Sequence, residues 1–254
     1  MDFGQGQGAW ALDVTGVLHH VDVAGFVQMT EETFALLSCG ADGVLWAMAS
    51  DQSEYLLYSL DHGAHWERVK APVENTRQLA GTPWGSCLVV TTNHSTLLVE
   101  KDGTCGVVFR EGEVDRISCS PDGYLWAISK DSKPGGGQLI KYCHHTQLTL
   151  QPLAGLPTGV AIASGPDGGA CAVTLGGEVL SIPMYQMAGL ETKGGEAFAA
   201  DISIGRDGTL WAISAESTPQ QLAHHLKYWH PQKDDFLAWH TVPDLEVRAV
   251  AGAW

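Results

Sequence analysis

Apolar and polar residues alternate over short stretches of this chain, and turn residues interrupt the alternation every few positions. Short, mostly apolar runs recur along the whole length, and several are joined by Asp-Gly. An Asp-Gly pair between alternating apolar runs is a strong hairpin signal, because the tight turn needs positive φ values that these residues tolerate. The pattern therefore predicts an all-β chain made of many short antiparallel strands.

Three stretches share the core Asp-Gly-x-Leu-Trp-Ala, followed by Met or Ile. Their tryptophans are Trp46, Trp126 and Trp211, so the intervals between them are 80 and 85 residues. Each interval is twice a period of about forty residues, which predicts a weaker copy in between. Both weaker copies are present, with Leu88 and Cys171 at the position of the tryptophan.

A further copy at the N-terminus brings the number of repeats to six. Four short antiparallel strands in each unit of about forty residues, repeated radially, describe the blades of a β-propeller. We therefore predict one domain over residues 1–254, a six-bladed β-propeller with four antiparallel strands per blade. The six anchor positions are Trp10, Trp46, Leu88, Trp126, Cys171 and Trp211.

The first repeat lacks an opening strand, because only Gly- and Gln-rich sequence precedes Trp10. The C-terminus carries a spare strand over residues 246–252. It contains Val250-Ala251, an apolar-then-small pair like those in the opening strands of the other five repeats. We expect this C-terminal strand to close the first blade, which would remove a free sheet edge.

The charge of the chain narrows the choice of partners. The formal net charge is −15, which argues against nucleic acid and anionic membranes, because both require a positive footprint. No apolar run approaches the length of a membrane span. The N-terminus lacks the basic start and apolar core of a secretory signal. We expect a cytoplasmic protein, or one exported without a conventional signal peptide.

The six cysteines contain no C-x-x-C pair. Several lie inside apolar strand patterns, where Cys behaves as a small hydrophobic residue. A chain of 254 residues does not need disulfides to build its core. We expect free thiols.

The D-G-x-L-W-A core at this period resembles the tectonin repeat, and the resemblance extends through the whole chain. Three repeats match well and three are degenerate. Tectonin proteins are β-propellers found among lectins of invertebrates, fish, fungi and slime moulds, and as interaction modules in larger proteins. The resemblance implies recognition of sugars or surfaces, often multivalent, without identifying the ligand.

Two motifs are interpreted as structural. Trp46 alternates faces with its neighbours along a strand, so we expect it to pack against the adjacent blade, the alternative being a sugar platform. Residues 59–66 fit the pattern S-x-D-x-G-x-x-W, which resembles the Asp-box turn of sialidase-like propellers. Sialidase chemistry would need clustered arginines for the substrate carboxylate, and the arginines here are scattered.

The second, fourth and sixth repeats have longer polar loops after the Trp strand, and the other three have tight connections. We infer three two-blade units and three similar grooves on the face of the blade-to-blade connections. Loops on a rigid scaffold are common binding sites, although these could also be ordinary solvated tips. The candidate ligand-binding residues are Asp51, Gln52, Glu54, Lys130, Asp131, Lys133, Glu216 and Gln220, with Asn93 and His94 between them.

The sequence offers no catalytic motif: G-x-S-x-G, H-E-x-x-H and a phosphate loop are all lacking. The three His-His pairs cannot easily chelate one ion, because neighbours on a strand point to opposite faces. The aspartates of the Asp-Gly turns are explained by their role in the hairpins. We expect no catalytic residues, no cofactor and no bound metal.

Three hypotheses for function follow. The first is a multivalent carbohydrate-binding propeller, whose partners are glycans or glycoconjugates and whose repeated weak sites gain avidity. The second is a protein-interaction scaffold whose acidic surface docks a basic protein. The third is an enzyme with its site at the central channel, where Arg116 and Asp201 could act, although a structural ion pair would explain both residues equally well.

Overall fold

The computed structural model describes residues 8–22, 24–51, 54–71, 75–132, 138–153, 155, 157–183, 191–192, 199–214, 224–230 and 239–254. Within these ranges the chain forms strands and turns and contains no helix. Accordingly, the described residues include no helix that could span a membrane.

The strands are short, apart from three longer ones, and tight turns or loops join them. In chain order they are β1 (Ala9–Asp13), β2 (Val17–Asp22), β3 (Gly25–Cys39), β4 (Leu45–Ala49), β5 (Tyr55–Ser59), β6 (Glu67–Lys70), β7 (Thr76–Gly81), β8 (Cys87–Thr91), β9 (Thr96–Val99), β10 (Cys105–Phe109), β11 (Val114–Cys119), β12 (Tyr124–Ser132), β13 (Gln138–His144), β14 (Gln151–Pro152), β15 (Gly159–Ser164), β16 (Ala170–Thr174), β17 (Val179–Ile182), β18 (Glu191–Thr192), β19 (Ala199–Ile204), β20 (Leu210–Ser214), β21 (His225–Trp229) and β22 (His240–Gly252).

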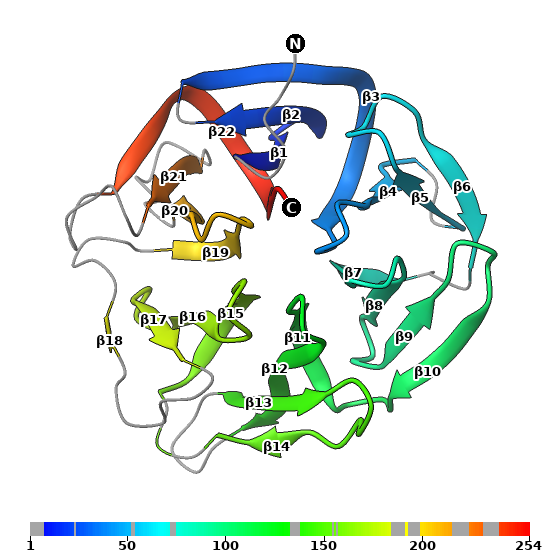
Figure 1. Ribbon diagram of the computed structural model, residues 1–254, viewed down its shortest axis with the longest axis vertical. Helices are drawn as coiled ribbons and strands as arrows, with labels where there is room; N and C mark the ends of the chain where they lie inside the picture. Colours follow the sequence, from blue (N-terminus) through cyan, green and yellow to red (C-terminus); the bar gives the residue numbers. More distant parts are fainter. Residues whose placement is uncertain are drawn as a thin grey trace.

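The sheets are arranged radially around a central axis, as Figure 1 shows. Three of them have four strands each, β7 to β10, β11 to β14 and β15 to β18, in simple up-and-down order. A fourth sheet has ten strands, in the order β19-β20-β21-β22-β1-β2-β3-β4-β5-β6. The protein therefore has an all-β, propeller-like architecture, and this part of the sequence-based expectation is confirmed.

The C-terminal strand β22 pairs with two different partners along its length. Its first part pairs with β21, where Glu246 lies opposite His225. Its last part pairs with β1, where Ala251 lies opposite Trp10. The expectation that the C-terminal strand completes the sheet of the first repeat is confirmed. Strand β3 behaves in the same way, pairing first with β2 and then with β4.

The six anchor residues occupy one equivalent place in the strand pairing. Each lies on the second strand of its repeat, between a small residue on the inner strand and a residue on the third strand. In three repeats the trio is Ser–Trp–Tyr: Ser38–Trp46–Tyr58, Ser118–Trp126–Tyr142 and Ser203–Trp211–Tyr228. In the other three it is Ala251–Trp10–His20, Ala80–Leu88–Leu98 and Ala163–Cys171–Ser181.

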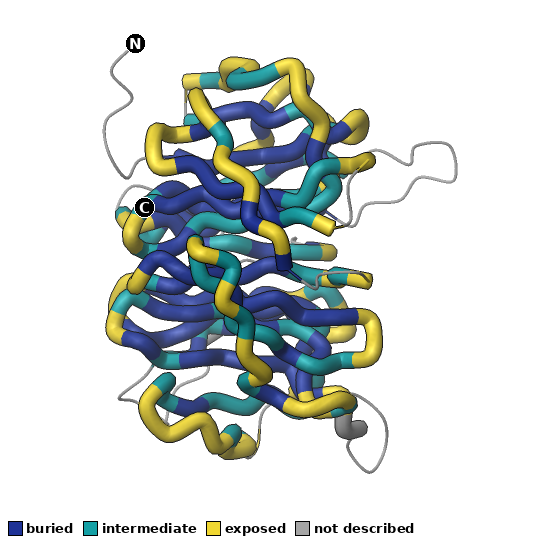
Figure 2. Tube along the Cα trace, turned by 90° about the vertical axis from the view of Figure 1, so that its right-hand side faces the viewer, coloured by how far each residue is buried: buried dark blue, intermediate teal, exposed yellow. Residues whose placement is uncertain are grey.

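Apolar packing between adjacent sheets forms the core. Trp46, Trp126 and Trp211 are 0%, 2% and 0% exposed, so their expected packing role is confirmed. Each anchor faces the next sheet around the ring: Trp126 packs with Ala170 and Ile182. Burial of apolar area at about 25 cal/mol per Å² is the main stabilising contribution to such a core. Figure 2 shows buried strands through the interior and exposed turns along both faces.

The Asp-box turn joins β5 to β6, where the motif predicted it. The Ser59 hydroxyl donates to the Asp61 carboxylate at 2.8 Å and accepts the Gly63 N–H at 2.9 Å. Asp61 also accepts the His65 N–H at 2.9 Å. These bonds satisfy the backbone of the turn, which is consistent with a structural role.

The Asp-Gly turns use their aspartates in a similar way. Asp207 accepts the Thr209 N–H at 2.9 Å, and Gly208 has a φ of 80°, a conformation that favours glycine. The aspartate at these turns therefore has the hairpin role that the sequence indicated.

Candidate functional site

The up-and-down topology gives the molecule two different faces. We call the face with the turns between first and second strands of each repeat the Asp-Gly face. The opposite face, called the loop face, carries the connections from one repeat to the next. The turn between β8 and β9 lies on the loop face, because the Asn93 and His94 carbonyls accept N–H bonds from Gly112 and Val114 at the start of β11. This placement agrees with the geometry inferred from the sequence.

The candidate loop residues are only partly covered by the structure. Asp51 and Glu54 flank the loop between β4 and β5, and both are exposed. Lys130 is exposed on β12, and Asp131 follows it on the same strand. The side chain of Asp131 lies outside the described residues. So do Gln52, Lys133, Glu216 and Gln220.

The other two candidates, Asn93 and His94, use their polar groups internally. The Asn93 side-chain oxygen accepts the Ser95 hydroxyl at 2.6 Å and also the Thr91 hydroxyl. His94 Nδ1 lies 3.2 Å from the Asp115 carboxylate. Both residues therefore stabilise the tight turn between β8 and β9, and they link it to β11.

A charged cluster on the loop face surrounds Asp115, whose side chain is 7% exposed. Arg77 Nη1 lies 2.7 Å from Asp115 Oδ1, and His94 contacts the same oxygen. The cluster joins the inner strands β7 and β11. A buried carboxylate needs such partners, because an unpaired buried charge is strongly unfavourable.

A central cavity of about 250 Å³ lies on the axis, lined by the inner strands β3, β7, β11, β15, β19 and β22. On each of the six inner strands one residue directly precedes the apolar-then-small pair. The cavity lining includes five of them, and the sixth, Ala161, is not part of it. The five are Leu36, Gln78, Arg116, Asp201 and Ala249.

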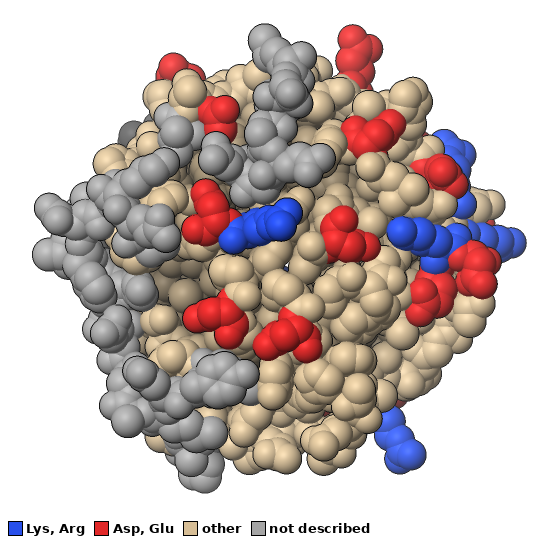
Figure 3. All heavy atoms as spheres, in the orientation of Figure 1, with Lys and Arg blue, Asp and Glu red and all other residues tan. Residues whose placement is uncertain are grey.

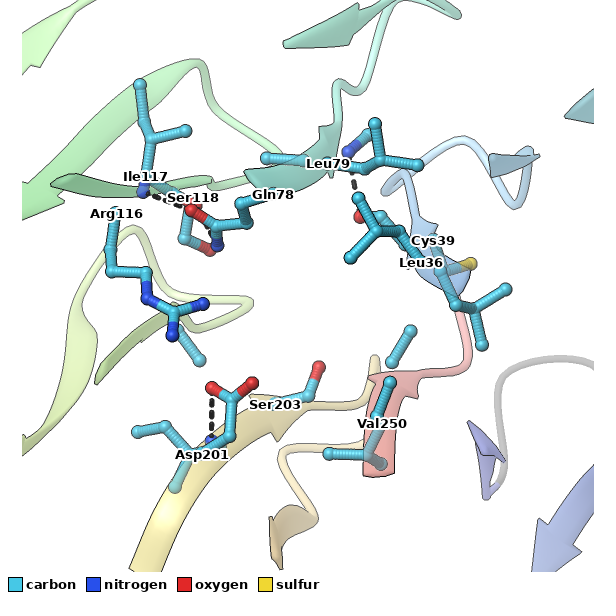
Figure 4. A pocket seen from close by; sticks show the side chains of 18 of the residues that line it. Leu36, Cys39, Gln78, Leu79, Arg116, Ile117, Ser118, Asp201, Ser203 and Val250 are labelled. Atoms are coloured by element: carbon cyan, nitrogen blue, oxygen red, sulfur yellow. Dashed lines mark hydrogen bonds between the residues drawn. The ribbon is translucent and has the colours of Figure 1, made fainter. Parts of the chain in front are cut away.

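Side chains at the cavity satisfy the exposed backbone of neighbouring inner strands. The hydroxyls of Ser38, Ser118 and Ser203 accept the N–H groups of the next inner strands, Gly81, Ser164 and Gly252, at 2.9, 2.9 and 2.7 Å. The equivalent residue in the alternate repeats is Ala. The Gln78 amide pairs with the Ile117 backbone through two bonds, at 3.0 and 2.9 Å. Side-chain hydrogen bonds therefore join adjacent inner strands around the central cavity (Figure 4).

Arg116 and Asp201 point toward one another across the cavity (Figure 4). Burial raises the pKa of Asp201, and the Arg116 charge and the Ile202 N–H partly oppose this rise. The Ile202 N–H donates to Asp201 at 2.9 Å. The pair places opposite charges on facing inner strands, which supports either a structural or a binding role.

Acidic side chains gather near the axis on the Asp-Gly face. Figure 3 shows them over the turns that join β3 to β4, β11 to β12, β15 to β16 and β19 to β20. These turns contain Asp42, Asp122, Asp167 and Asp207. These carboxylates therefore border the mouth of the central cavity on this face, and the basic Arg206 of the turn between β19 and β20 lies among them.

Trp84 is the most exposed of the nine tryptophans, at 41%. It lies in the tight turn between β7 and β8 on the Asp-Gly face, and its ring lies 4.6 Å from that of His145, tilted by 35°. Both partners are held firmly: the Thr82 hydroxyl accepts the Ser86 N–H at 3.0 Å, and the His145 N–H donates to the Gly123 carbonyl at 2.9 Å. We call this pair the Trp84–His145 platform.

The histidine pairs do not assemble a metal site within the described ranges, which contain no group of three or more His, Cys, Asp or Glu suited to a metal ion. His19 Nε2 lies 2.9 Å from the Asp13 carboxylate, and His20 packs edge-on against Trp10. The six cysteines, all of which are described, form no disulfide, and burial raises the pKa of Cys143 to about 11.

No protein-family model matches the sequence, and no curated protein matches it. Solved structures do match over nearly its whole length. A chain of a nidogen/laminin complex is 12% identical with a TM-score of 0.66, covering 96% of each chain. A gluconolactonase from Xanthomonas campestris is 11% identical with a TM-score of 0.60, covering 97% of this chain and 90% of the other.

A virginiamycin B lyase from Staphylococcus aureus is 13% identical with a TM-score of 0.57, covering 94% of this chain and 85% of its own. At these identities the likeness concerns the fold alone. Because both enzymes and a component of a protein complex share it, the fold does not decide between catalysis and binding.

Two features escaped the sequence analysis. Trp84 was one of them: it stands in the degenerate third repeat where other repeats have the aspartate of the Asp-Gly turn, and this position could have indicated an exposed ring. Ser181 was also missed. Aligning the third strands on Tyr58, Tyr142 and Tyr228 would have identified it as the small residue at an aromatic position.

Proposed function

We propose that this chain is a six-bladed β-propeller of the tectonin type that binds carbohydrate without catalysing a reaction. The blade count is supported by dividing the ten-stranded sheet at β22 and β3, each of which pairs with two partners. That division gives three four-stranded units beside the three separate four-stranded sheets.

The observation that carries the binding proposal is the Trp84–His145 platform. An aromatic ring that is 41% exposed on a rigid turn offers an apolar face to the C–H face of a sugar ring. In the adjoining turn His144 Nε2 donates to the Asp122 carbonyl at 3.1 Å, and the Asp122 carboxylate of that turn is the nearby acceptor proposed for sugar hydroxyls.

The absence of catalysis is supported by the use of the polar groups along the axis. Ser38, Ser118 and Ser203 hold neighbouring inner strands together through their hydroxyls. Gln78 has the same role between β7 and β11. A structural role between inner strands therefore accounts for these serines without a reaction.

A glycan array is the direct test, with methylated and other modified sugars included. We expect wild-type protein to bind at least one glycan class and Trp84→Ala to lose most of that signal. Leu175→Ala is the matched control, because Leu175 is 75% exposed in the turn between β16 and β17 on the loop face. Failure of the wild-type protein to bind any glycan would overturn the carbohydrate proposal.

The loop face is a separate candidate for the same activity, because the sequence gives the second, fourth and sixth repeats longer polar loops on that face. A double variant, Asp51→Ala with Glu54→Ala, tests it, because both residues are exposed. Loss of glycan signal in the double variant with retention in Trp84→Ala would place binding at the loops. The reverse result would place it at the Trp84–His145 platform.

A second candidate function is a scaffold that docks a basic protein segment on the Asp-Gly face. The net charge of −15 and the acidic side chains around the axis favour it. Binding of a Lys-rich peptide should then weaken steeply with salt, because exposed charges are screened within about 8–10 Å at physiological ionic strength. Salt-insensitive binding, or none, would count against this candidate.

A further inference from the structure

At one interface between adjacent sheets, a cavity lies beside the anchor residue of the repeat, Cys171. A cavity of about 270 Å³ lies between the sheet of β15 to β18 and the strands β19 to β21. Cys171 and Ser181 line it on one side, and Leu210 and Trp229 line it on the other. We call it the Cys171 cavity.

The neighbouring interface shows what normally occupies this space. There the indole of Trp126 packs beside Tyr142, with ring centroids 5.5 Å apart. Its Nε1–H donates to the Gly168 carbonyl in the turn of the next sheet, at 2.9 Å. Cys171 and Ser181 stand at the strand positions of Trp126 and Tyr142. The loss of two large rings at one place accounts for the Cys171 cavity.

The other degenerate repeats are filled in different ways. Leu88 pairs with Leu98 and is 1% exposed, and Trp10 pairs with His20 and is 2% exposed. The combination of two small side chains occurs only at Cys171 and Ser181 among the six equivalent pairs. This combination accounts for the position of the Cys171 cavity.

The cavity walls define the chemistry of an occupant. Trp229 presents an indole where the equivalent residue at the Trp126 interface is Ile182. The turn glycine Gly208 lines the cavity and corresponds to Gly168, and within the described residues no donor reaches its carbonyl. The lining also includes the Asp167 carboxylate but no Lys, Arg or His.

We propose that the Cys171 cavity is a binding site for a planar aromatic group of about the size of indole that carries an N–H or O–H donor. The ring takes the place that Trp126 occupies at the neighbouring interface and contacts Trp229, and the donor bonds the Gly208 carbonyl. An apolar cavity of about 150 Å³ is already large enough for benzene, so 270 Å³ accommodates an indole. Anionic aromatics are disfavoured by Asp167. This site is independent of carbohydrate binding.

The test is ¹⁹F NMR of 5-fluoroindole titrated with the purified protein. We expect saturable line broadening with wild type. Cys171→Trp and Ser181→Tyr, which restore the residues of the other repeats, should each weaken binding at least tenfold. Leu98→Tyr introduces a tyrosine at the equivalent position of another repeat and should leave binding unchanged. Thermal melts confirm that each variant is folded, and Ser181→Tyr tests the site if Cys171→Trp does not fold.

Displacement experiments show whether the bound aromatic group is a peptide side chain or a free small molecule. Competition by indole and by N-acetyltryptophanamide would support a site that takes a tryptophan side chain of a peptide. Competition by indole alone would support a free small molecule. Indole-3-acetate should compete at least tenfold more weakly than indole. The proposal is overturned if wild type does not bind 5-fluoroindole, if binding survives both cavity-filling variants, or if indole-3-acetate competes as well as indole.

Discussion

The interfaces on either side of the β15 to β18 sheet have the same backbone register and different interiors. On one side Trp126 fills the gap and hydrogen-bonds across it to Gly168. On the other side Cys171 and Ser181 leave a cavity, and Trp229 contributes an aromatic ring to its opposite wall. The backbone arrangement therefore does not depend on the anchor tryptophan being present in every repeat. One filled interface can support an adjacent hollow one, which releases that position for binding.

The largest loss of stability should come from removing the Trp126 ring. Trp126→Ala removes a 2% exposed ring and its bond to Gly168, and large aromatic truncations in cores cost about 3–5 kcal/mol. At about 2–4 °C per kcal/mol for a chain of this size, the melting temperature should fall by roughly 10 °C. Cys171→Ala is the matched change and should cost less than about 1 kcal/mol. Equal losses for the two variants would contradict the comparison.

The inner strands at the two interfaces differ by one hydroxyl. Ser118 accepts the Ser164 N–H at 2.9 Å, whereas Ala163 occupies the equivalent position at the hollow interface. Ser118→Ala should cost about 1–3 kcal/mol, because the Ser164 N–H loses its acceptor. Denaturant unfolding measures this loss. Ser118→Thr, which keeps the hydroxyl, serves as the control, and no difference between Ala and Thr would argue against a role for the bond.

Filling the Cys171 cavity should increase the stability of the folded protein. Cys171→Leu adds apolar atoms into a cavity of about 270 Å³, and cavity-filling changes commonly stabilise by about 0.5–2 kcal/mol. Leu88→Ile is the control, since it rearranges a 1% exposed side chain that already fills its site. Calorimetric melting would detect the gain. A loss of stability in Cys171→Leu would mean that the void is too narrow or too rigid to be filled.

The smallest effect concerns pH and the charges of the inner strands. Burial raises the pKa of Asp201 above its ordinary value, so the folded state favours the protonated carboxyl. The associated stability is present at acidic pH below the ordinary pKa and is lost as pH rises through the raised value. Asp201→Asn should remove this dependence, and Arg116→Gln should push the Asp201 pKa higher still. If the melting temperatures of wild type and Asp201→Asn change in parallel between pH 3 and pH 7, Asp201 is not the source of this pH dependence.

The repeat made most of the fold predictable. Trp46, Trp126 and Trp211 recur with Asp-Gly turns at a fixed spacing, and the Val250-Ala251 pair indicated that the last strand joins the first sheet. These features depend on local turn chemistry and on alternation, both of which are written in short stretches of sequence. The expected all-β, propeller-like arrangement followed from them.

The candidate site was less predictable, because it depends on which residues meet across an interface. Asn93 and His94 look like free loop residues in sequence, but the structure uses them to hold a turn and an inner strand. Ser181 is unremarkable alone and matters only beside Cys171. The exposure of Trp84 depends on its neighbour His145, which comes from a different sheet.

The double pairing of β22 sets a condition on the folding of the chain. Trp10 acquires its inner-strand partner only from Ala251, so the first sheet stays incomplete until the last strand is added. Contacts between such distant parts of a sequence form slowly, because the entropy of closing the loop opposes them. During synthesis β1 would lack this partner until residues 247–252 of β22 leave the ribosome. A product shortened before β22 would therefore leave one edge of β1 unpaired, and such an open edge favours aggregation.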